Sequence, residues 1–210
     1  MTLAVFTSAE AQKSAPWVGE SDAGIPCSGG RQGVGPLDYT NPVDRSMGVF
    51  DTVEDFHFTR EIEMLQGKNT AGDLDYTLRA IPNHHRALAA MMRYQESPNS
   101  QQALQSANAP AIECYLKRAA NFAPHDRNID ALFGLLKHRR GDQEGALTIY
   151  KQAISKGEVP VELYYNMGLL LVEMNRSKEA LAYARKAYAR GYPLRGLAKK
   201  LQAEGMEIDF

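Results

Sequence analysis

The sequence lacks the short motifs by which the common enzyme classes are recognised. It has no phosphate-binding loop of the G-x-x-x-x-G-K type, no G-x-S-x-G nucleophile elbow and no H-E-x-x-H zinc pair. The stretch GGRQGVG does not qualify as a nucleotide loop, because no strand is predicted before it and no helix directly after it. Asp38, Asp73 and Asp75 are explained as turn and cap residues. We therefore expect no enzyme activity, no catalytic residues and no cofactor.

The sequence also lacks an excess of charge and a long apolar run. Its 24 Lys and Arg residues nearly balance 25 Asp and Glu residues, for a net charge of −1 over 210 residues. Sequence-independent binding of nucleic acid requires a strong basic field, so we expect no nucleic-acid partner. No segment approaches the roughly 20 apolar residues that a membrane-spanning helix needs. With 44% hydrophobic and 23% charged residues, the composition is that of an ordinary globular protein.

The charge is unevenly distributed along the chain. Residues 1–84 contain 6 Lys and Arg against 12 Asp and Glu, a net charge of −6, whereas residues 85–210 contain 18 against 13, a net charge of +5. Such an asymmetry favours head-to-tail contact between molecules, or folding of the acidic part against the basic part. A solvated imbalance without a role is the alternative.

Cysteine is scarce, and its two occurrences lie in no metal-type spacing. Cys27 and Cys114 are separated by 86 residues, and an even count in an exported protein predicts one disulfide. Closing a loop of this length contributes about 4 kcal/mol in the chain-entropy model. The alternative is a pair of free thiols in a cytosolic protein, with Cys114 as a small buried hydrophobe.

The N-terminus favours export. The stretch MTLAVFTSAEAQ contains a short apolar run followed by Ala9-Glu10-Ala11, which fits the small-x-small rule before a signal-peptidase cut, although it lacks a basic start. We interpret residues 1–11 as the remainder of a secretory signal peptide and expect a periplasmic or extracellular protein. A disordered N-terminus of a cytosolic protein is the alternative.

The segment 127–193 repeats itself with an offset of 34 residues. Gly134 recurs as Gly168, Ala146 as Ala180 and Ala153 as Ala187. A fixed period of this length, with small residues at fixed positions, is typical of a helix–turn–helix solenoid. The small residues are expected where two antiparallel helices approach closely.

This period organises the rest of the chain. We predict repeats at about 85–126, 127–160 and 161–193, with the eight extra residues of the first repeat in the polar stretch ESPNSQQALQSANAP. Residues 12–52 are rich in Gly and Pro and are predicted to form an irregular arm. Residues 53–84 are predicted as an atypical helical cap and 194–210 as a C-terminal capping helix.

Helix signals refine the two predicted caps. Thr59 is a plausible N-cap. Asp73 is predicted to cap a short helix from Leu74 to Ala80. In the C-terminal segment, Leu194, Leu197 and Leu201 are predicted to share one apolar face.

Residues 85–193 resemble the tetratricopeptide repeat family, through Gly134, Ala146 and Ala153 and their counterparts 34 residues later. The remaining stretches GPLDYTNP, HFTREIEMLQGK and DYTLRAIPNHHRAL, with the terminal ARGYPLRGL, are similar to exported bacterial tetratricopeptide proteins of unassigned role. The resemblance implies an all-α, short helical solenoid that acts as a scaffold for protein binding. It implies no activity.

Solenoids of this type bind through the concave surface made by the first helix of each pair. By repeat phase, the exposed inner positions are Arg86, Ala89, Arg93, Asn128, Ala131, Leu135, His138, Glu162, Tyr165, Asn166, Leu169 and Glu173. This surface has a basic start, an apolar middle and an acidic end. Recognition of a C-terminal carboxylate by Lys and Asn is not expected, because only Asn166 matches that pattern.

The expected occupant of this groove is a partner protein or an extended peptide with apolar anchors. The chain's own N-terminal arm is the alternative occupant. A structural protein that assembles head-to-tail, or by placing its arm in the groove of another copy, into oligomers or filaments, is the second functional hypothesis.

His84 and His85, with His57 upstream, are the nearest approach to a metal site. Adjacent histidines at a helix start point about 100° apart in a helix of 3.6 residues per turn, and no carboxylate follows either at i+4. We predict a capping or interface role for Asn83 and His84, and no metal site.

Overall fold

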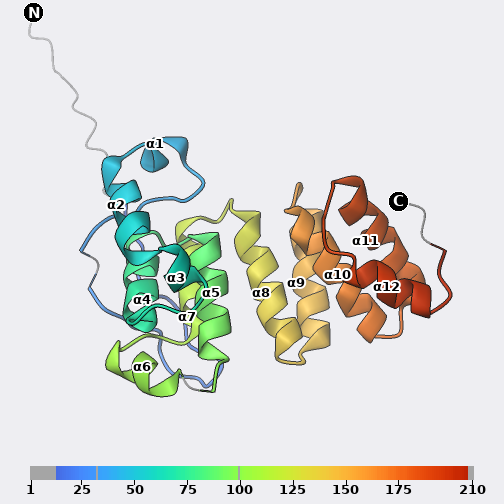
Figure 1. The fold of residues 1–210 in the computed structure, drawn as a ribbon, viewed down its shortest axis with the longest axis horizontal. Helices are drawn as coiled ribbons and strands as arrows, with labels where there is room; N and C mark the ends of the chain where they lie inside the picture. Colours follow the sequence, from blue (N-terminus) through green and yellow to red (C-terminus); the bar gives the residue numbers. More distant parts are fainter. Residues whose placement is uncertain (1–12, 32, 99, 208–210) are drawn as a thin grey trace, which may run out of the picture.

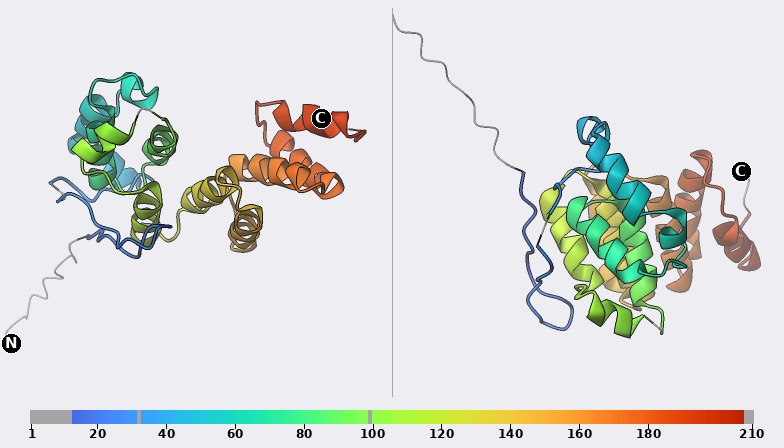
Figure 2. Two further views of the ribbon diagram at one scale, coloured as in Figure 1. Left: turned by 90° about the horizontal axis from the view of Figure 1, so that it is seen from below. Right: turned by 60° about the vertical axis from the view of Figure 1, so that its left-hand side comes forward.

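The computed structural model describes residues 13–31, 33–98 and 100–207, and within these ranges the chain forms twelve helices and no strand. The predicted all-α fold class is confirmed (Figure 1). Seven helices, which we call the N-terminal group, cluster at one end, and the others extend away from them (Figure 1, Figure 2). No helix of the described ranges is long and apolar enough to cross a bilayer. The predicted signal peptide lies outside the described residues.

The N-terminal group packs around two apolar clusters. The larger has Leu74, Met91 and Leu116 among its buried side chains. The smaller includes Phe50 and Val53. The helices of the group are α1 (Pro42–Arg45), α2 (Gly48–His57), α3 (Arg60–Glu63), α4 (Thr70–Ala80), α5 (His85–Gln95), α6 (Gln101–Ser106) and α7 (Ile112–Phe122). The predicted insertion between the helices of the first repeat contains α6.

Two boundaries differ from the sequence predictions, and one predicted cap is confirmed. The predicted irregular arm, 12–52, ends earlier, because Asn41 caps α1 through its side chain and α2 already begins at Gly48. The prediction that Asp73 caps a helix from Leu74 is wrong, since α4 begins at Thr70, where Thr70 and Ala71 are buried. Thr59 is confirmed as an N-cap, its side chain accepting from the Ile62 amide of α3.

Two helical hairpins follow, and we call them, with α12, the hairpin region. They are α8 (Arg127–Arg139) with α9 (Gln143–Ser155), and α10 (Val161–Glu173) with α11 (Ser177–Ala189). Every helix boundary of the second hairpin lies 34 residues after its counterpart in the first. The turns repeat as well: Gly141 and Asn175 both have positive φ after the first helix, as do Gly157 and Gly191 after the second. A left-handed residue at this place ends a helix at low steric cost when it is Gly or Asn.

The repeated alanines and glycines differ in what surrounds them. Ala146 and Ala180 are both fully buried in one apolar cluster. A methyl group added at Gly134 would collide with the Tyr150 ring of α9, within the same hairpin. A methyl group added at Gly168 would instead collide with the Leu197 side chain of α12. Both positions require glycine, but only the first for the reason predicted from the sequence.

Helix α12 (Gly196–Ala203) covers the end of the stack. Leu197 and Leu201 are buried against α10 and α11, as the apolar pattern predicts. The prediction for Leu194 is wrong: this side chain lies before the helix begins and is 56% exposed. Its carbonyl accepts a hydrogen bond from the Tyr188 hydroxyl at 3.0 Å, which ties the segment between α11 and α12 to α11.

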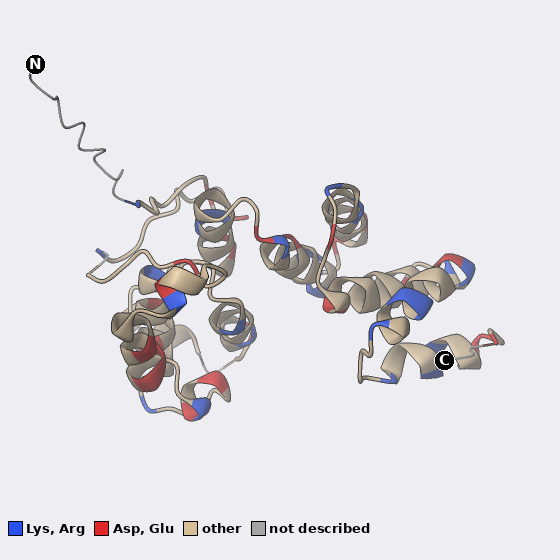
Figure 3. Cartoon of the chain, turned by 90° about the horizontal axis from the view of Figure 1, so that it is seen from above, with Lys and Arg blue, Asp and Glu red and all other residues tan. Residues whose placement is uncertain are grey.

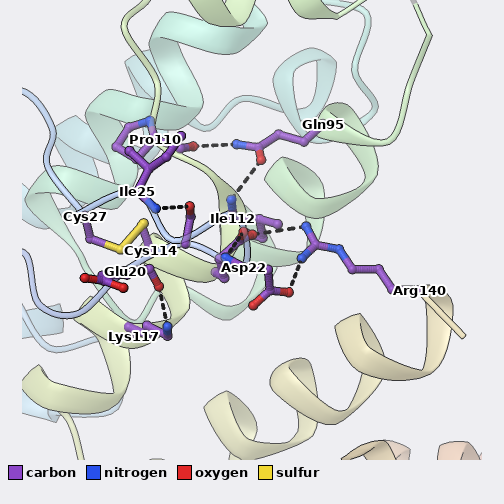
Figure 4. Close-up of a disulfide and its surroundings, with 12 residues drawn as sticks. Glu20, Asp22, Ile25, Cys27, Gln95, Pro110, Ile112, Cys114, Lys117 and Arg140 are labelled. Atoms are coloured by element: carbon purple, nitrogen blue, oxygen red, sulfur yellow. Dashed lines mark hydrogen bonds and ion pairs between the residues drawn. A yellow bond between two sulfur atoms is a disulfide. The ribbon is translucent and has the colours of Figure 1, made fainter. Parts of the chain in front are cut away.

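The arm packs on the N-terminal group through specific bonds. The predicted Cys27–Cys114 disulfide is confirmed and ties the arm to α7 (Figure 4). The fully buried Arg118 of α7 donates to the carbonyl oxygens of Ala15 and Leu78 at 2.6 and 2.7 Å. Its guanidinium also lies 4.9 Å from the Trp17 ring centroid. These bonds hold the described part of the arm on α4 and α7.

Candidate functional site

A groove of about 490 Å³ crosses the first helices of three successive helical pairs. Its lining comes from α5, α8 and α10, with two residues from connecting segments. The lining residues are His85, Arg86, Ala89, Asn128, Ala131, Leu132, Leu135, Pro160, Glu162, Asn166 and Tyr192. The middle of the groove is apolar and amide-bearing, and its charged groups lie toward α5 and α10. The arrangement suits an extended chain with an apolar centre.

A buried carboxylate joins α5 to α8 beside the groove. His85 Nε2 lies 2.6 Å from Asp126 Oδ2, and Asn83 donates to the same oxygen at 3.0 Å. Asp126 also caps α8 by accepting from the Asn128 amide at 3.1 Å. Burial raises the pKa of Asp126, but the hydrogen bonds from His85, Asn128 and Asn83 outweigh it and hold that pKa below its ordinary value. The carboxylate therefore stays ionised and fixes the His85 ring.

The same polar cluster reaches the arm. Asn83 donates to Asp38 Oδ1 at 2.8 Å and accepts from the Tyr39 amide at 2.9 Å. Next to it, the fully buried His84 accepts the Ala87 amide at Nδ1, 3.1 Å away, and caps α5. Its proton is therefore on Nε2, which donates to Glu54 at 2.8 Å. The predicted capping role of His84 is confirmed.

Arg86 lies at the α5 end of the groove, and the carboxylate of Glu63 partly neutralises its charge. Its Nε donates to Glu63 Oε1 at 2.8 Å, and a second N–H of the same guanidinium bonds the other carboxylate oxygen. These bonds lower the pKa of Glu63. The Arg86 guanidinium also lies 5.3 Å from the Phe58 ring centroid. This residue is thus held by α3, although its side chain is more than half exposed.

The structure brings together seven of the twelve positions that repeat phase assigns to the inner surface. Arg86 and Ala89 come from α5, and the others from α8 and α10. The remaining five are Asn128, Ala131, Leu135, Glu162 and Asn166. These residues of α5, α8 and α10 line one groove.

The other five predicted positions do not line the groove. Arg93 donates to the Glu63 carbonyl at 3.0 Å. His138 and Glu173 pair across α8 and α10, with 2.7 Å between Nε2 and Oε2. Tyr165 is buried with its ring centroid 4.4 Å from that of Tyr192. Leu169 packs half-buried on the core.

Four lining residues were not predicted from the sequence: His85, Leu132, Pro160 and Tyr192. His85 and Leu132 are adjacent in sequence to the predicted positions Arg86 and Ala131. A prediction that included the residue on each side of every inner position would have found them. Pro160 precedes α10, and Tyr192 follows α11. Repeat phase within helices gives no signal for residues in connecting segments.

The described part of the N-terminal arm does not fill the groove of its own chain. The lining contains no residue from 13–31 or 33–41. Those residues contact α4 and α7, and Asp22 pairs with Arg140 at the C-terminal end of α8 at 2.6 Å (Figure 4). They reach the lining only at its edge, where the Tyr39 ring centroid lies 4.9 Å from that of His85. The groove is therefore accessible to another chain so far as the described residues show.

The described lining of the groove includes no Ser, Cys or Lys. Within 13–31, 33–98 and 100–207, no three His, Cys, Asp or Glu side chains are arranged to hold a metal ion. His57 Nδ1 lies 2.9 Å from Asp73 Oδ1, whereas His84 pairs with Glu54 and His85 with Asp126. The three histidines that were considered together thus have three different partners.

A larger hollow of about 570 Å³ lies elsewhere, between the end of α5, α6 and the start of α7. Gln95, Gln101 and Gln105 contribute much of its lining. Gln95 is already used there: its side chain bonds both the Pro110 carbonyl and the Ile112 amide, at 2.7 and 2.8 Å. We therefore take the groove that spans three helical pairs as the candidate site.

Comparisons with protein-family models, with curated proteins and with solved structures found no match. The function is consequently inferred from the geometry of the groove and its surroundings. The groove offers apolar contact, amide hydrogen bonds and a charge of each sign.

Proposed function

We propose that the chain is a non-catalytic binding scaffold, a tetratricopeptide-type solenoid that binds a protein or peptide segment in the groove between α5, α8 and α10. The observation that carries the proposal is the convergence of seven phase-related residues on one groove. The 34-residue offset shared by every helix boundary of the two hairpins supports the repeat type. An exposed groove across successive repeats is the surface such scaffolds use.

The lining defines the ligand. Ala131, Leu132 and Leu135 offer an apolar floor, so the bound segment carries apolar side chains at its centre. Asn128 and Asn166 supply amide groups that can bond the ligand backbone. Arg86 favours an acidic residue toward α5, and Glu162 favours a basic one toward α10.

Export to the periplasm or the cell exterior belongs to the same proposal. A disulfide such as Cys27–Cys114 forms and persists in oxidising compartments and is rare in the cytosol. The intact mass of the natively expressed protein tests this. Two hydrogens fewer than the reduced chain, and loss of residues 1–11, are expected.

The binding experiment starts from random peptides about ten residues long, a length that spans a groove of three helices. Peptides displayed on phage are selected on the immobilised, oxidised chain. One selected peptide is then synthesised with a fluorescent label and titrated by anisotropy. We expect an apolar centre in the selected sequences and a Kd of about 1–100 μM, typical of a short segment on a single surface.

A matched pair of variants locates the site. Ala89→Arg fills the groove, whereas Ala182→Arg adds the same side chain on the exposed side of α11. Helix propensity barely differs between Ala and Arg, so both variants should fold, which circular dichroism checks. We expect Ala89→Arg to weaken peptide binding at least about tenfold and Ala182→Arg to leave it within about twofold. Equal binding by the two variants, or no selectable peptide, would refute the groove as the site.

A further inference from the structure

An exposed apolar surface lies on α1 and α2, outside the groove lining. Among the described residues seven large hydrophobic side chains are exposed, and four of them fall in this short segment. They are Val43, Met47, Val49 and Phe56, with Phe56 the most exposed at 72%. Val49 and Phe56 are seven residues apart and share one face of α2. Clusters of this kind mark interaction surfaces more often than scattered single residues do.

Acidic side chains accompany this surface. Asp51 and Asp55 are exposed on α2, which has no Lys or Arg. The exposed cation of α1 is Arg45, whose guanidinium lies 5.1 Å from the Tyr39 ring centroid. Glu54, the third carboxylate of α2, is directed to His84. We call the exposed side of α1 and α2, with Asp51 and Asp55, the acidic–apolar head.

The opposite end of the molecule carries the complementary charge. Residues 180–203 contain six Lys and Arg residues and no Asp or Glu. All six are exposed, and Leu194 is exposed among them. They are Arg185, Lys186, Arg190, Arg195, Lys199 and Lys200. We call the exposed surface of residues 180–203 the basic tail (Figure 3). Carboxylates border it at Glu179 and at Glu173, whose Oε1 lies 4.0 Å from Lys200 Nζ.

Aromatic rings help to hold several of these cations at the surface. Lys186 Nζ lies 5.4 Å from the Tyr183 ring centroid. Arg190 and Arg195 lie 5.0 and 5.2 Å from the centroids of Tyr164 and Tyr188. Side chains restrained in this way lose less conformational entropy when a partner binds. The basic tail is therefore preorganised to bind an anionic surface.

The two surfaces cannot meet within one molecule. The head lies at one end of the fold and the tail at the other (Figure 1). Contact between them therefore requires a second copy. Because two different surfaces meet, the contact is heterologous and continues from copy to copy unless a ring closes.

We propose that the acidic–apolar head of one copy docks on the basic tail of another, giving head-to-tail assemblies. Phe56, Val49 and Leu194 supply the apolar contact, and Asp51 and Asp55 face cations of the tail. None of the residues named for either contact lines the groove, so assembly and peptide binding use different residues. Charge complementarity makes the association sensitive to salt, because exposed pairs are screened.

The first measurement is sedimentation of the oxidised full chain over a range of concentrations. At about 20 mM salt we expect the average mass to rise with concentration, and at about 500 mM salt the association to weaken at least about tenfold. A chain that stays monomeric at low salt up to about 500 μM, where even weak contacts of low-millimolar Kd become visible, contradicts the proposal.

Charge reversal then identifies the two surfaces. The head variant is Asp51→Lys with Asp55→Lys, and the tail variant is Arg185→Glu with Lys199→Glu. Each alone brings like charges together and should weaken self-association at least about tenfold. The equimolar mixture should associate again, because the reversed head of one variant fits the reversed tail of the other.

Two controls separate this contact from others. Lys68→Glu with Lys156→Glu makes the same change in net charge as the tail variant, at exposed positions outside both surfaces, and should leave association within about twofold. Ala89→Arg should also leave it unchanged. A tail variant that associates as tightly as the unmodified chain would show a contact of head with head and overturn the proposal. A mixture that fails to associate would overturn it as well.

Discussion

The N-terminal group and the hairpin region are both helical, but they are held together by different forces. Of the buried polar and charged residues, ten lie between Asp44 and Asp126, and Ser177 alone lies in the described hairpin region. The first region is joined by a disulfide and by hydrogen bonds between residues far apart in the sequence. The second is joined by apolar packing between neighbouring helices.

This difference determines how each region responds to change. Buried charges and long-range bonds make the N-terminal group sensitive to pH and to reduction. Local apolar contacts make the hairpin region insensitive to both, but sensitive to side-chain volume. The groove lies across the boundary, since α5 belongs to one region and α8 and α10 to the other.

The largest expected effect is that of Arg118→Leu. Burial lowers the pKa of Arg118 to about 10, yet the residue stays charged at neutral pH and bonds the carbonyls of Ala15, Leu78 and Arg79. Its loss leaves buried acceptors unsatisfied, so we expect destabilisation by about 3–5 kcal/mol in urea unfolding. The control Arg185→Leu, on the exposed side of α11, should change stability by less than about 0.5 kcal/mol. Equal effects would remove the distinction between the regions.

Removal of the disulfide is expected to cost less. The bridge closes a loop across a sequence separation of 87 residues, and its loss in Cys27→Ser with Cys114→Ser should destabilise by about 2–4 kcal/mol. Reduction of the unmodified chain should give a similar shift of the urea midpoint. A shift within error of zero would show that the arm is held without the bridge.

In the hairpin region the corresponding test is a change of side-chain volume in the apolar core. Gly134→Ala pushes a methyl group into the Tyr150 ring, and overpacking of this kind costs about 1–3 kcal/mol. The position equivalent to Tyr150 in the second hairpin is Ala184. In a Tyr150→Ala background, Gly134→Ala should therefore lower the free energy of unfolding by less. A double-mutant cycle measures this coupling. Strict additivity would mean that Gly134 is required for another reason.

The smallest expected effect is a gradual change of folding stability with pH, caused by His84. Burial lowers the pKa of His84, although the hydrogen bond to Glu54 opposes the shift. The unfolded chain therefore binds a proton at His84 more readily, and stability should fall as pH drops below about 6.5, the unfolded value. His84→Asn, which keeps an acceptor for the cap, should be less stable at pH 7 but show a flatter dependence between about pH 7 and 5. An unchanged slope would assign the dependence to other groups.

The repeat could be predicted from the sequence because its signal is local. Gly134, Ala146 and their counterparts mark helix contacts at a fixed spacing, and α8 and α10 begin at the predicted residues 127 and 161. The short helices α1 and α3 have four residues each, too few for an apolar period to be recognised. Leu194 fits the apolar period but lies outside the helix, which periodicity alone does not reveal.

The site could be predicted in part, for the same physical reason. Repeat phase identifies inner positions within helices such as Ala89 and Asn166, but not Tyr192, which reaches the groove from a connecting segment. The polar cluster around Asn83 and Asp126 joins residues 43 positions apart, and no local pattern signals it. The burial of Arg118 is equally invisible, since arginine is ordinarily assigned to the surface.

Amide hydrogen exchange of the full chain, before and after reduction of the disulfide, tests most directly whether two differently held regions exist. Reduction should raise exchange in residues 13–31 and in the helices α4 and α7 that the arm covers, by about tenfold or more. Helices α9, α10 and α11 should exchange as before. A uniform loss of protection across all of these helices would contradict the account, because it would show one cooperative structure in which the arm stabilises the hairpins as much as its own neighbours.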